Sequence, residues 1–338
     1  MQNLDNDNML GNFLLAPLAE LSHRPLRELI EGFKAHDCQL SADEYFTEMI
    51  SAAALITDGP FEEWYLDGDP CPQKLVYQLV GDNADTLIKA VSLLDKKECL
   101  GIDINMHCSA PAITRTGAGV RWMADIDKAG NLIRRARSKT QRRLSVKLCI
   151  GLADDLDFLV RFCRRLEEEG LDLITLHPRT AKEKFKRKAR WSYIHALRKE
   201  LRIPLAGNGD IISAEEMLRR REECDAVMVG RLAVRQPWIF REVREKKQHP
   251  SRQSHEVCCS NLEETGLRFL ELLSRYQPPE FHLSRARRFF GYFCDNLKWG
   301  THVKNLLNRE TGLSGIERAW RGYFAENAGE IEIASSFF

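Results

Sequence analysis

The chain has 338 residues, of which 43% are hydrophobic and 29% charged, and its formal net charge is +1. This composition is typical of a globular protein with one large domain, or with one large and one small domain. It excludes a polycation, so any surface for nucleic acid must come from local clusters of Lys and Arg. The polar, acidic N-terminus lacks the features of a secretory signal, and no apolar run approaches the roughly 20 residues that span a bilayer. We therefore expect a soluble cytoplasmic protein with no membrane partner.

Ten cysteines are scattered along the chain, and no two of them have C-x-x-C spacing. Because that spacing is typical of zinc and iron–sulfur sites, we expect no structural metal. Cys258 and Cys259 lie near His255, but two adjacent thiols rarely bind one ion. Several cysteines lie in apolar segments, which is typical of small buried residues in a reducing compartment.

Short apolar segments alternate with longer amphipathic ones over about the first 245 residues. Runs rich in Ile, Val and Leu suit strands that are buried on both faces. Eight strands alternating with helices over this length predict a closed TIM (β/α)8 barrel of the α/β class. A doubly wound open sheet is disfavoured, because no glycine triad follows the first strand and Gly207-Asn208-Gly209 lacks the third glycine. The predicted strands are 13–16, 45–50, 75–80, 101–106, 144–150, 171–176, 203–206 and 226–229.

Three helices are expected among these strands. Ser22 is a candidate N-cap for a helix over 24–34, and residues 213–216 (Ser-Ala-Glu-Glu) form a capping box. Residues 156–168 carry apolar side chains at helical spacing.

The last third of the chain has a different pattern. Residues 246–254 are polar and contain a proline, which predicts a linker. Residues 260–263 (Ser-Asn-Leu-Glu) form a second capping box, and apolar residues then recur at helical spacing. We therefore predict a barrel domain over 1–245 and a small helical domain over 255–338.

Polar residues follow the ends of several predicted strands. The carboxyl ends of barrel strands meet at one face, which carries the active site. The residues expected in one shared cavity there are Gln78, Asn105, His107, Cys108, Lys147, His177, Arg179, Asn208, Gly209, Asp210, Gly230 and Arg231.

Some of these residues indicate specific chemistry. Gly209, Gly230 and Arg231 could bind a phosphate after the last two strands, or the glycines could simply make tight turns. Lys147 lies in an apolar strand, where a lysine needs an anionic partner such as a reduced flavin, or acts as a Schiff-base lysine. His177 alone could equally be a buried structural histidine.

Cys108 is the sharpest candidate for a catalytic residue. A cysteine of ordinary pKa is mostly protonated at neutral pH, so it can donate a proton as well as act as a nucleophile. It opens a loop with Gly117 and Gly119, where a lid could form.

Taken together, these segments resemble the tRNA-dihydrouridine synthases, a family of flavin-dependent TIM-barrel enzymes. The resemblance runs in order over about residues 14–245, and the spacing from Cys108 to Gly117 agrees with it. Its motifs are residues 16–19 (Ala-Pro-Leu-Ala), 47–49, 78–81, 103–108, 117–119, 146–151, 177–180, 208–211 and 230–231, with 236–240 (Gln-Pro-Trp-Ile-Phe) also similar.

The resemblance implies a flavin mononucleotide (FMN) in the barrel mouth, reduced by NADPH, and reduction of a uracil base in RNA. Hydride would pass to C6 of the base and Cys108 would protonate C5, for which a largely neutral thiol is suited. The base must leave its stack to reach a buried flavin. Asn105 would hold the base, and Gln78, Lys147 and His177 would contact the flavin ring. The remaining cofactor contacts that it implies are Pro17, Leu18, Ala19, Asn208, Gly209, Asp210, Gly230 and Arg231.

Two motifs depart from the family pattern. The usual Gly-Cys-Pro is replaced by His107, Cys108 and Ser109, and the usual His-Gly-Arg-Thr has Pro178 in place of glycine. The first change touches the loop that presents the acid, so His107 either assists proton transfer or marks altered chemistry.

Local basic runs predict the RNA-facing surface. The run 134–143 is predicted to be a solvated helix face, whereas the run 182–190 directly follows the His177 loop and is predicted to bind phosphates. Residues 285–292 loosely resemble the helical RNA-binding domain of the family. The residues predicted to contact RNA, with tRNA as the expected partner of a monomeric protein, are Arg179, Lys182, Lys184, Lys186, Arg285 and Arg288.

Two alternatives stay open at this point. One is a small-molecule FMN oxidoreductase of the dihydroorotate-dehydrogenase type, against which the basic run and the helical tail argue. The other is an RNA-binding family member with altered catalysis, which the changed Cys108 loop suggests.

Overall fold

The computed structural model describes residues 10–33, 41–183, 186–249 and 260–333. Contacts divide the chain into two compact units. The first unit comprises Met1–Pro17, Asp43–Ile211 and Arg219–Val229, and the second comprises Leu18–Ala42, Ile212–Leu218 and Gly230–Phe338. The predicted domain boundaries near 245 and 255 stay a prediction, because this division also groups short earlier segments with the C-terminal helices.

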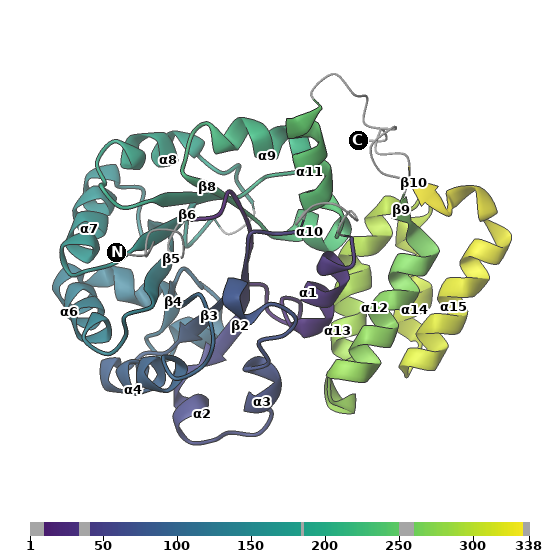
Figure 1. The fold of residues 1–338 in the computed structure, drawn as a ribbon, viewed down its shortest axis with the longest axis horizontal. Helices are drawn as coiled ribbons and strands as arrows, with labels where there is room; N and C mark the ends of the chain where they lie inside the picture. Colours follow the sequence, from purple (N-terminus) through teal and green to yellow (C-terminus); the bar gives the residue numbers. More distant parts are fainter. Residues whose placement is uncertain (1–9, 34–40, 184–185, 250–259, 334–338) are drawn as a thin grey trace, which may run out of the picture. The chain divides into compact units, whose positions relative to one another are not determined.

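Eight parallel strands close into a barrel in the first unit (Figure 1). Each strand pairs with the next one along the chain, and β8 pairs back to β1, where Met228 lies opposite Leu14. The predicted (β/α)8 barrel is therefore confirmed. The strands are β1 (Phe13–Leu15), β2 (Glu44–Ser51), β3 (Leu75–Val80), β4 (Gly101–Met106), β5 (Arg143–Gly151), β6 (Leu173–Thr180), β7 (Leu205–Asn208) and β8 (Ala226–Val229).

Two strands end later than their apolar runs. β6 was expected over 171–176 and β7 over 203–206, but the strands continue to Thr180 and Asn208. β6 continues because His177 and Thr180 pair with Cys149 and Gly151 of β5. An apolar run ends at the first polar residue, whereas a barrel strand continues while its backbone is paired and its polar side chains face the mouth.

Helices surround the strands of the first unit, with α4, α6, α7 and α8 on its outer side (Figure 1). Asn83, Asp125 and Asp155 cap α4, α6 and α7, since each side chain accepts a backbone N–H of the first turn. α7 has the predicted bounds, and it buries Leu159, Cys163 and Leu166 of the apolar stripe that predicted it. The helices are α2 (Ala52–Ile56), α3 (Glu62–Tyr65), α4 (Ala84–Leu94), α5 (Pro111–Thr114), α6 (Ile126–Arg137), α7 (Leu156–Glu168), α8 (Trp191–Arg198) and α9 (Ala214–Arg221), the last of which runs across the division between the units.

A buried ion pair lies at the amino-terminal end of the strands. Arg143 begins β5 and Glu44 begins β2, and their side chains are only 5% and 3% exposed. The guanidinium donates to both carboxylate oxygens, with an Nη1–Oε1 distance of 2.8 Å. Removing one partner of such a pair typically costs about 3–5 kcal/mol, because it leaves a buried charge unpaired.

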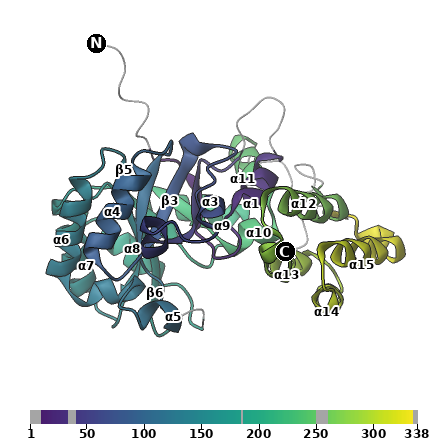
Figure 2. The same ribbon diagram turned by 90° about the horizontal axis from the view of Figure 1, so that it is seen from below.

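The second unit is helical, and its core is aromatic. Phe269 stacks on Phe289 with ring centroids 3.7 Å apart, and Trp320 packs against Phe290 and Phe324. Figures 1 and 2 show α12 to α15 as neighbours within this unit. Its helices are α1 (Arg24–Glu31), α10 (Arg231–Arg235), α11 (Ile239–Gln248), α12 (Leu262–Tyr276), α13 (Pro279–Phe293), α14 (Gly300–Arg309) and α15 (Leu313–Glu326), and β9 (Ser260–Asn261) pairs antiparallel with β10 (Glu332–Ile333).

Two of the three predicted caps were wrong in detail. Ser22 does not cap α1, because its hydroxyl accepts from the N–H of Leu18 and donates to the carbonyl of that residue. α12 is capped by Asn261 rather than Ser260, since the Asn261 amide oxygen accepts from Glu264 at 2.9 Å. The cap by Ser213 is confirmed by its contact with the Glu216 N–H.

The predicted linker is also corrected in part. Residues 246–248 belong to α11, which ends at Gln248. Residues 250–254 of the predicted linker, together with His255, Cys258 and Cys259, lie outside the described residues.

Candidate active site in the barrel

A buried hydrogen-bond network joins the inward faces of β3, β4 and β5. Asp103 lies at its centre and has no exposed surface. Ser145 Oγ donates to Oδ1 of this carboxylate at 2.6 Å, and Gln78 Nε2 donates to Oδ2 at 2.7 Å. Gln78 is itself positioned by Thr47, whose hydroxyl accepts the Gln78 backbone N–H at 2.9 Å. The interior of this side of the barrel is therefore polar and ordered.

Asn105 connects this network to the loop that carries Cys108. Its Nδ2 donates to Gln78 Oε1 at 3.0 Å. Its Oδ1 accepts from the backbone N–H groups of Cys108 at 2.8 Å and His107 at 3.1 Å. At the far end of the loop, Gly119 has a φ of +62°, and a Cβ there would lie 2.4 Å from the Cys108 carbonyl oxygen. Asn105 of β4 thus holds the first end of the Cys108 loop, and the far end packs back on the Cys108 carbonyl, which accepts from the Val120 N–H at 3.0 Å.

The carboxyl of Asp103 has a pKa close to neutral pH. Burial raises the pKa of its carboxyl to about 6, although the hydrogen bonds from Ser145 and Gln78 and the charge of Lys147 act in the opposite direction. Asp103 is therefore mostly ionised at neutral pH and accepts both hydrogen bonds.

Lys147 is a buried lysine whose charge interacts with that of Asp103 but which has no hydrogen-bond or ion-pair partner among the described residues. Its side chain lies on β5 between Asn105 and Thr175 in the strand register and is 4% exposed. Burial lowers its pKa to about 8. Within the described part of the chain the ammonium makes no hydrogen bond or ion pair, and the buried Thr175 hydroxyl also lacks a partner. Buried donors of this kind are costly unless something else accepts from them. An anionic reduced flavin ring is a group that Lys147 fits.

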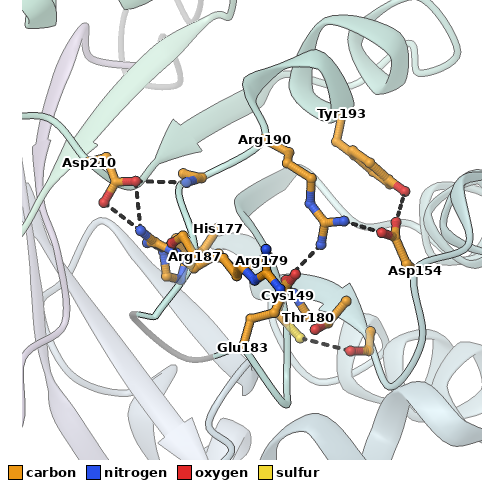
Figure 3. A network of polar contacts seen from close by, with 12 residues as sticks. Cys149, Asp154, His177, Arg179, Thr180, Glu183, Arg187, Arg190, Tyr193 and Asp210 are labelled. Carbon is orange, nitrogen blue, oxygen red and sulfur yellow. Dashed lines mark hydrogen bonds and ion pairs between the residues drawn. The ribbon is translucent and has the colours of Figure 1, made fainter.

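His177 lies in a chain of hydrogen bonds, and Figure 3 labels its members Asp210, Arg179 and His177. Asp210 accepts from Arg179 Nη2 through both carboxylate oxygens at 2.6 Å. Arg179 Nη1 lies 2.7 Å from His177 Nε2, and His177 Nδ1 lies 2.8 Å from His107 Nε2. Because His177 contacts an arginine that can only donate, it is a positioned side chain and not a free base.

The basic loop after β6 is anchored to this chain (Figure 3). The Ala189 N–H donates to Asp210 at 2.7 Å, and Arg179 donates to the Arg187 carbonyl. At its base, Arg190 pairs with Glu183 at 2.7 Å. The loop is therefore fixed at both ends relative to the barrel strands.

Cys108 differs from the other described cysteines. It is partly exposed, whereas the remaining described cysteines are buried. Burial raises the pKa of Cys99 and of Cys149 to about 11. Among the described thiols, Cys108 is thus the one that a substrate can reach.

The structure shows what three residues of the predicted phosphate site contact. Asn208 donates to the Met228 carbonyl at 2.8 Å. Gly209 has a φ of +118°, and a Cβ there would lie 2.6 Å from the His177 ring, so only glycine fits. Asp210 is engaged by Arg179. Pro17 belongs to the first unit, whereas Leu18, Ala19, Gly230 and Arg231 belong to the second, so their shared role in cofactor binding stays a prediction.

The predicted RNA contacts fall into different environments. Lys182 and Lys186 are exposed on the basic loop, as RNA contacts must be, while Lys184 lies outside the described residues. Arg179 is 4% exposed and holds Asp210 and His177, so its guanidinium is part of the barrel interior. Arg288 is 51% exposed at its side chain and lies 3.8 Å from Glu20.

Arg285 was wrongly predicted to be a surface contact. It is 2% exposed, donates to Gln277 and lies over the Phe281 ring at 4.5 Å. Helical spacing places it on one face with Arg288, but the start of the same helix and the preceding turn cover that face at Arg285.

Sequence reasoning missed several residues of the site. Asp103, Ser145 and Thr175 were hidden within the apolar strands. Their signal is a polar residue at every second position: 103 and 105 in β4, 145 and 147 in β5, 175 and 177 in β6. That period of two marks the face of a strand that points into the barrel.

Over the described residues, no group of three or more His, Cys, Asp or Glu side chains could hold a metal ion. The helices of the same residues include none long and apolar enough to cross a membrane.

The fold and the site define an enzyme of the (β/α)8-barrel class whose polar centre is built from residues of β3 to β6. The sequence pattern described as dihydrouridine synthase matches residues 14–320. The chain belongs to the dihydrouridine synthase family.

Individual relatives agree with this assignment. A probable tRNA-dihydrouridine synthase of Aquifex aeolicus is 33% identical over 243 residues, which is 70% of this chain and 74% of the relative. A probable tRNA-dihydrouridine synthase of Rhizobium leguminosarum is 30% identical over 67% of this chain and 69% of the relative. A tRNA-dihydrouridine(47) synthase-like protein of Mus musculus is 30% identical over 70% of this chain, but the match covers only 37% of that longer protein.

Proposed function

We propose that this chain reduces a uridine of RNA, with tRNA as the expected substrate, to 5,6-dihydrouridine, using FMN as cofactor and NADPH as reductant. Family membership supports the reaction class. The names of the Aquifex and Rhizobium relatives specify tRNA, and those of the mouse and human relatives include NAD(P)(+). A cytoplasmic, monomeric enzyme is part of the same proposal.

One observation carries the assignment: the ammonium of Lys147 is buried in the barrel with no partner among the described residues. When bound, FMN supplies the hydride. Lys147 would hold the flavin ring by stabilising its negative charge, a role for which a positioned cation in a dry site is well suited. Gln78 and His177 would contact the ring from β3 and β6, although His177 already contacts Arg179 and His107.

Cys108 would donate the proton to C5 of the base. It is the accessible thiol among the described cysteines, and its backbone is held by Asn105. Because Asn105 Oδ1 accepts from the loop, only its remaining amide N–H is left to hold the base. The exposed Lys182 and Lys186 would bind phosphates beside this entrance.

Nucleoside mass spectrometry tests the proposal directly. Purified protein reconstituted with FMN is incubated with NADPH and tRNA that lacks modifications, and uridine should gain two mass units. Cys108→Ala should lose at least about 100-fold of this activity, since general acids typically contribute that much. Cys71→Ala, which removes a buried thiol elsewhere in the unit, should stay near the wild-type rate.

A protein that takes up no FMN in an absorbance titration would exclude the proposed chemistry. A protein that oxidises NADPH with a free unsaturated pyrimidine such as orotate as the hydride acceptor, but leaves tRNA unchanged, would favour the small-molecule alternative.

A further inference from the structure

His107 ends a chain of hydrogen bonds whose direction is determined by chemistry. An arginine has N–H donors and no acceptor, so Arg179 must donate to His177 Nε2, 2.7 Å away. The proton of His177 therefore lies on Nδ1 and is donated to His107 Nε2, 2.8 Å away. His107 consequently carries its own proton on Nδ1. Asp210, bound through both carboxylate oxygens to Arg179, fixes the beginning of this chain.

The Nδ1–H of His107 is left pointing out of this chain. No hydrogen bond to it exists among the described residues, and the side chain is half-buried. The residue directly precedes Cys108. Burial lowers the pKa of His107 well below its usual range, and the nearby charge of Lys147 lowers it further, so the ring stays neutral and keeps its single proton.

We propose that His107 is a substrate-binding residue that donates its Nδ1–H to a carbonyl oxygen of the base beside Cys108, and that Arg179 and His177 position it for this role. The inference rests on the proposed function and adds a residue to it. Where the family has glycine, this chain would have an additional donor in its active site.

A donor at this place would favour the reaction by stabilising charge that develops on the base. When C6 of uracil accepts the hydride, which comes from the reduced flavin, the electron pair of the C5–C6 double bond moves through C5 and C4 onto O4. The Cys108 S–H bond then breaks, its proton joins C5, and a thiolate is left. A neutral N–H donor at O4 stabilises the negative charge that develops between these two events. A charged imidazole is not required, so His107 adds no proton-transfer step.

The competing interpretation is that His107 only packs against His177. The two roles use different nitrogens of one ring, and two substitutions separate them. The amide N–H of asparagine lies near the place of imidazole Nδ1–H, so His107→Asn keeps the donor and loses the contact with His177. The amide oxygen of glutamine lies near the place of Nε2, so His107→Gln keeps the contact with His177 and loses the donor at Nδ1.

The experiment measures kcat and KM for uridine reduction in the FMN-loaded wild type and in both variants. We expect His107→Asn to stay within about fivefold of wild type and His107→Gln to lose about 100-fold in kcat, the effect of removing one such donor. His107→Gly, which restores the family residue, should resemble His107→Gln, so the result does not depend on one variant folding. FMN absorbance and circular dichroism verify that each protein is intact.

A second readout does not involve activity. NMR of protein with isotope-labelled histidine distinguishes the two neutral ring forms, and His107→Gln assigns the signal of His107. Wild type should show the Nδ1–H form of His107 without titration between pH 6 and 8.

The outcomes separate the inference from the function on which it rests. If the wild type reduces no uridine, both the proposed function and the inference about His107 are wrong. An active wild type in which His107→Gln outperforms His107→Asn, or in which His107 carries its proton on Nε2, overturns the inference alone.

Discussion

The two units of this protein use their interiors in opposite ways. The core of the helical unit consists of aromatic side chains: Phe269 stacks on Phe289, and Trp320 packs against Phe290 and Phe324. The barrel unit places charged and amide groups at its centre, with Asp103 fully buried and Lys147 4% exposed. Aromatic packing contributes free energy of folding, whereas buried polar groups contribute little and specify orientation.

The comparison indicates where stability and function lie. A change in the helical core should lower the free energy of unfolding and leave the chemistry of the barrel unchanged. Removing an unpartnered donor from the barrel centre should slow the chemistry and raise the free energy of unfolding, because such donors are kept there at the expense of stability.

The largest effect is expected for Lys147→Met. Loss of the ammonium removes charge stabilisation from the reaction, so the rate of uridine reduction should fall by about 1,000-fold, or about 4 kcal/mol in barrier height. The same variant should unfold at a higher urea concentration than wild type at pH 7, because methionine fills the space without burying a charge. Stopped-flow kinetics and urea titration measure the two effects.

The stability difference should depend on pH. Burial lowers the pKa of Lys147 to about 8 in the folded protein, below the value of about 10.4 in the unfolded chain. The unfolded state therefore binds more protons between these values, and wild-type stability should rise as pH increases from about 8 to 10. The advantage of Lys147→Met should shrink over that window. An advantage that is constant from pH 8 to 10 would show that the folded barrel does not lower the pKa of Lys147.

The next effect belongs to the helical core. Trp320→Ala should cost about 3–5 kcal/mol, because a fully buried indole leaves a large cavity. It also loses the hydrogen bond from Nε1 to the Glu263 carbonyl at 3.0 Å. FMN affinity at a temperature where the variant is folded should stay at the wild-type value. If FMN binding were also lost, the aromatic core of the helical unit would affect the cofactor site, contrary to this prediction.

A smaller effect is expected for Ser145→Ala in the barrel. The hydroxyl stabilises the ionised form of Asp103, whose pKa is about 6. Removing a hydrogen bond to a charged group typically costs about 1.5–3 kcal/mol, and this cost applies above pH 6, where Asp103 is ionised. Below pH 6 Asp103 is protonated in wild type and variant alike, so the cost should fall by at least half. Urea unfolding at pH 5 and pH 8 checks this, with Ser284→Ala on the surface of α13 as control.

The architecture followed from the sequence because its signals are local and repeated. Eight apolar runs separated by helix-length segments leave few folds, and α7 over 156–168 was predicted from the spacing of its apolar residues. Cys108 and Lys147 were found because a thiol in a glycine-bearing loop and a lysine in an apolar strand are each unusual.

What could not be predicted depends on contacts between distant segments. The pair of Arg143 with Glu44 joins residues 99 positions apart, and the contact of His107 with His177 joins residues 70 positions apart. Arg285 was placed on the surface because helical spacing says which residues share a face, and does not say what covers that face. Two caps, Ser22 and Ser260, were misassigned by one position for a similar reason, since either of two neighbouring polar residues can start a helix.

The smallest predicted effect tests that last point. α12 begins after two candidate caps, Ser260 and Asn261, and the Asn261 side chain accepts a first-turn N–H. Asn261→Ala should therefore lower the free energy of unfolding by about 1 kcal/mol, whereas Ser260→Ala should change it by less than about 0.5 kcal/mol. Urea unfolding of both variants compares them within one segment of the helical unit. Equal losses would mean that the Ser260 hydroxyl and the Asn261 amide share the cap. The capping residue of a helix in this unit would then be less sharply defined than the hydrogen-bond partners in the barrel.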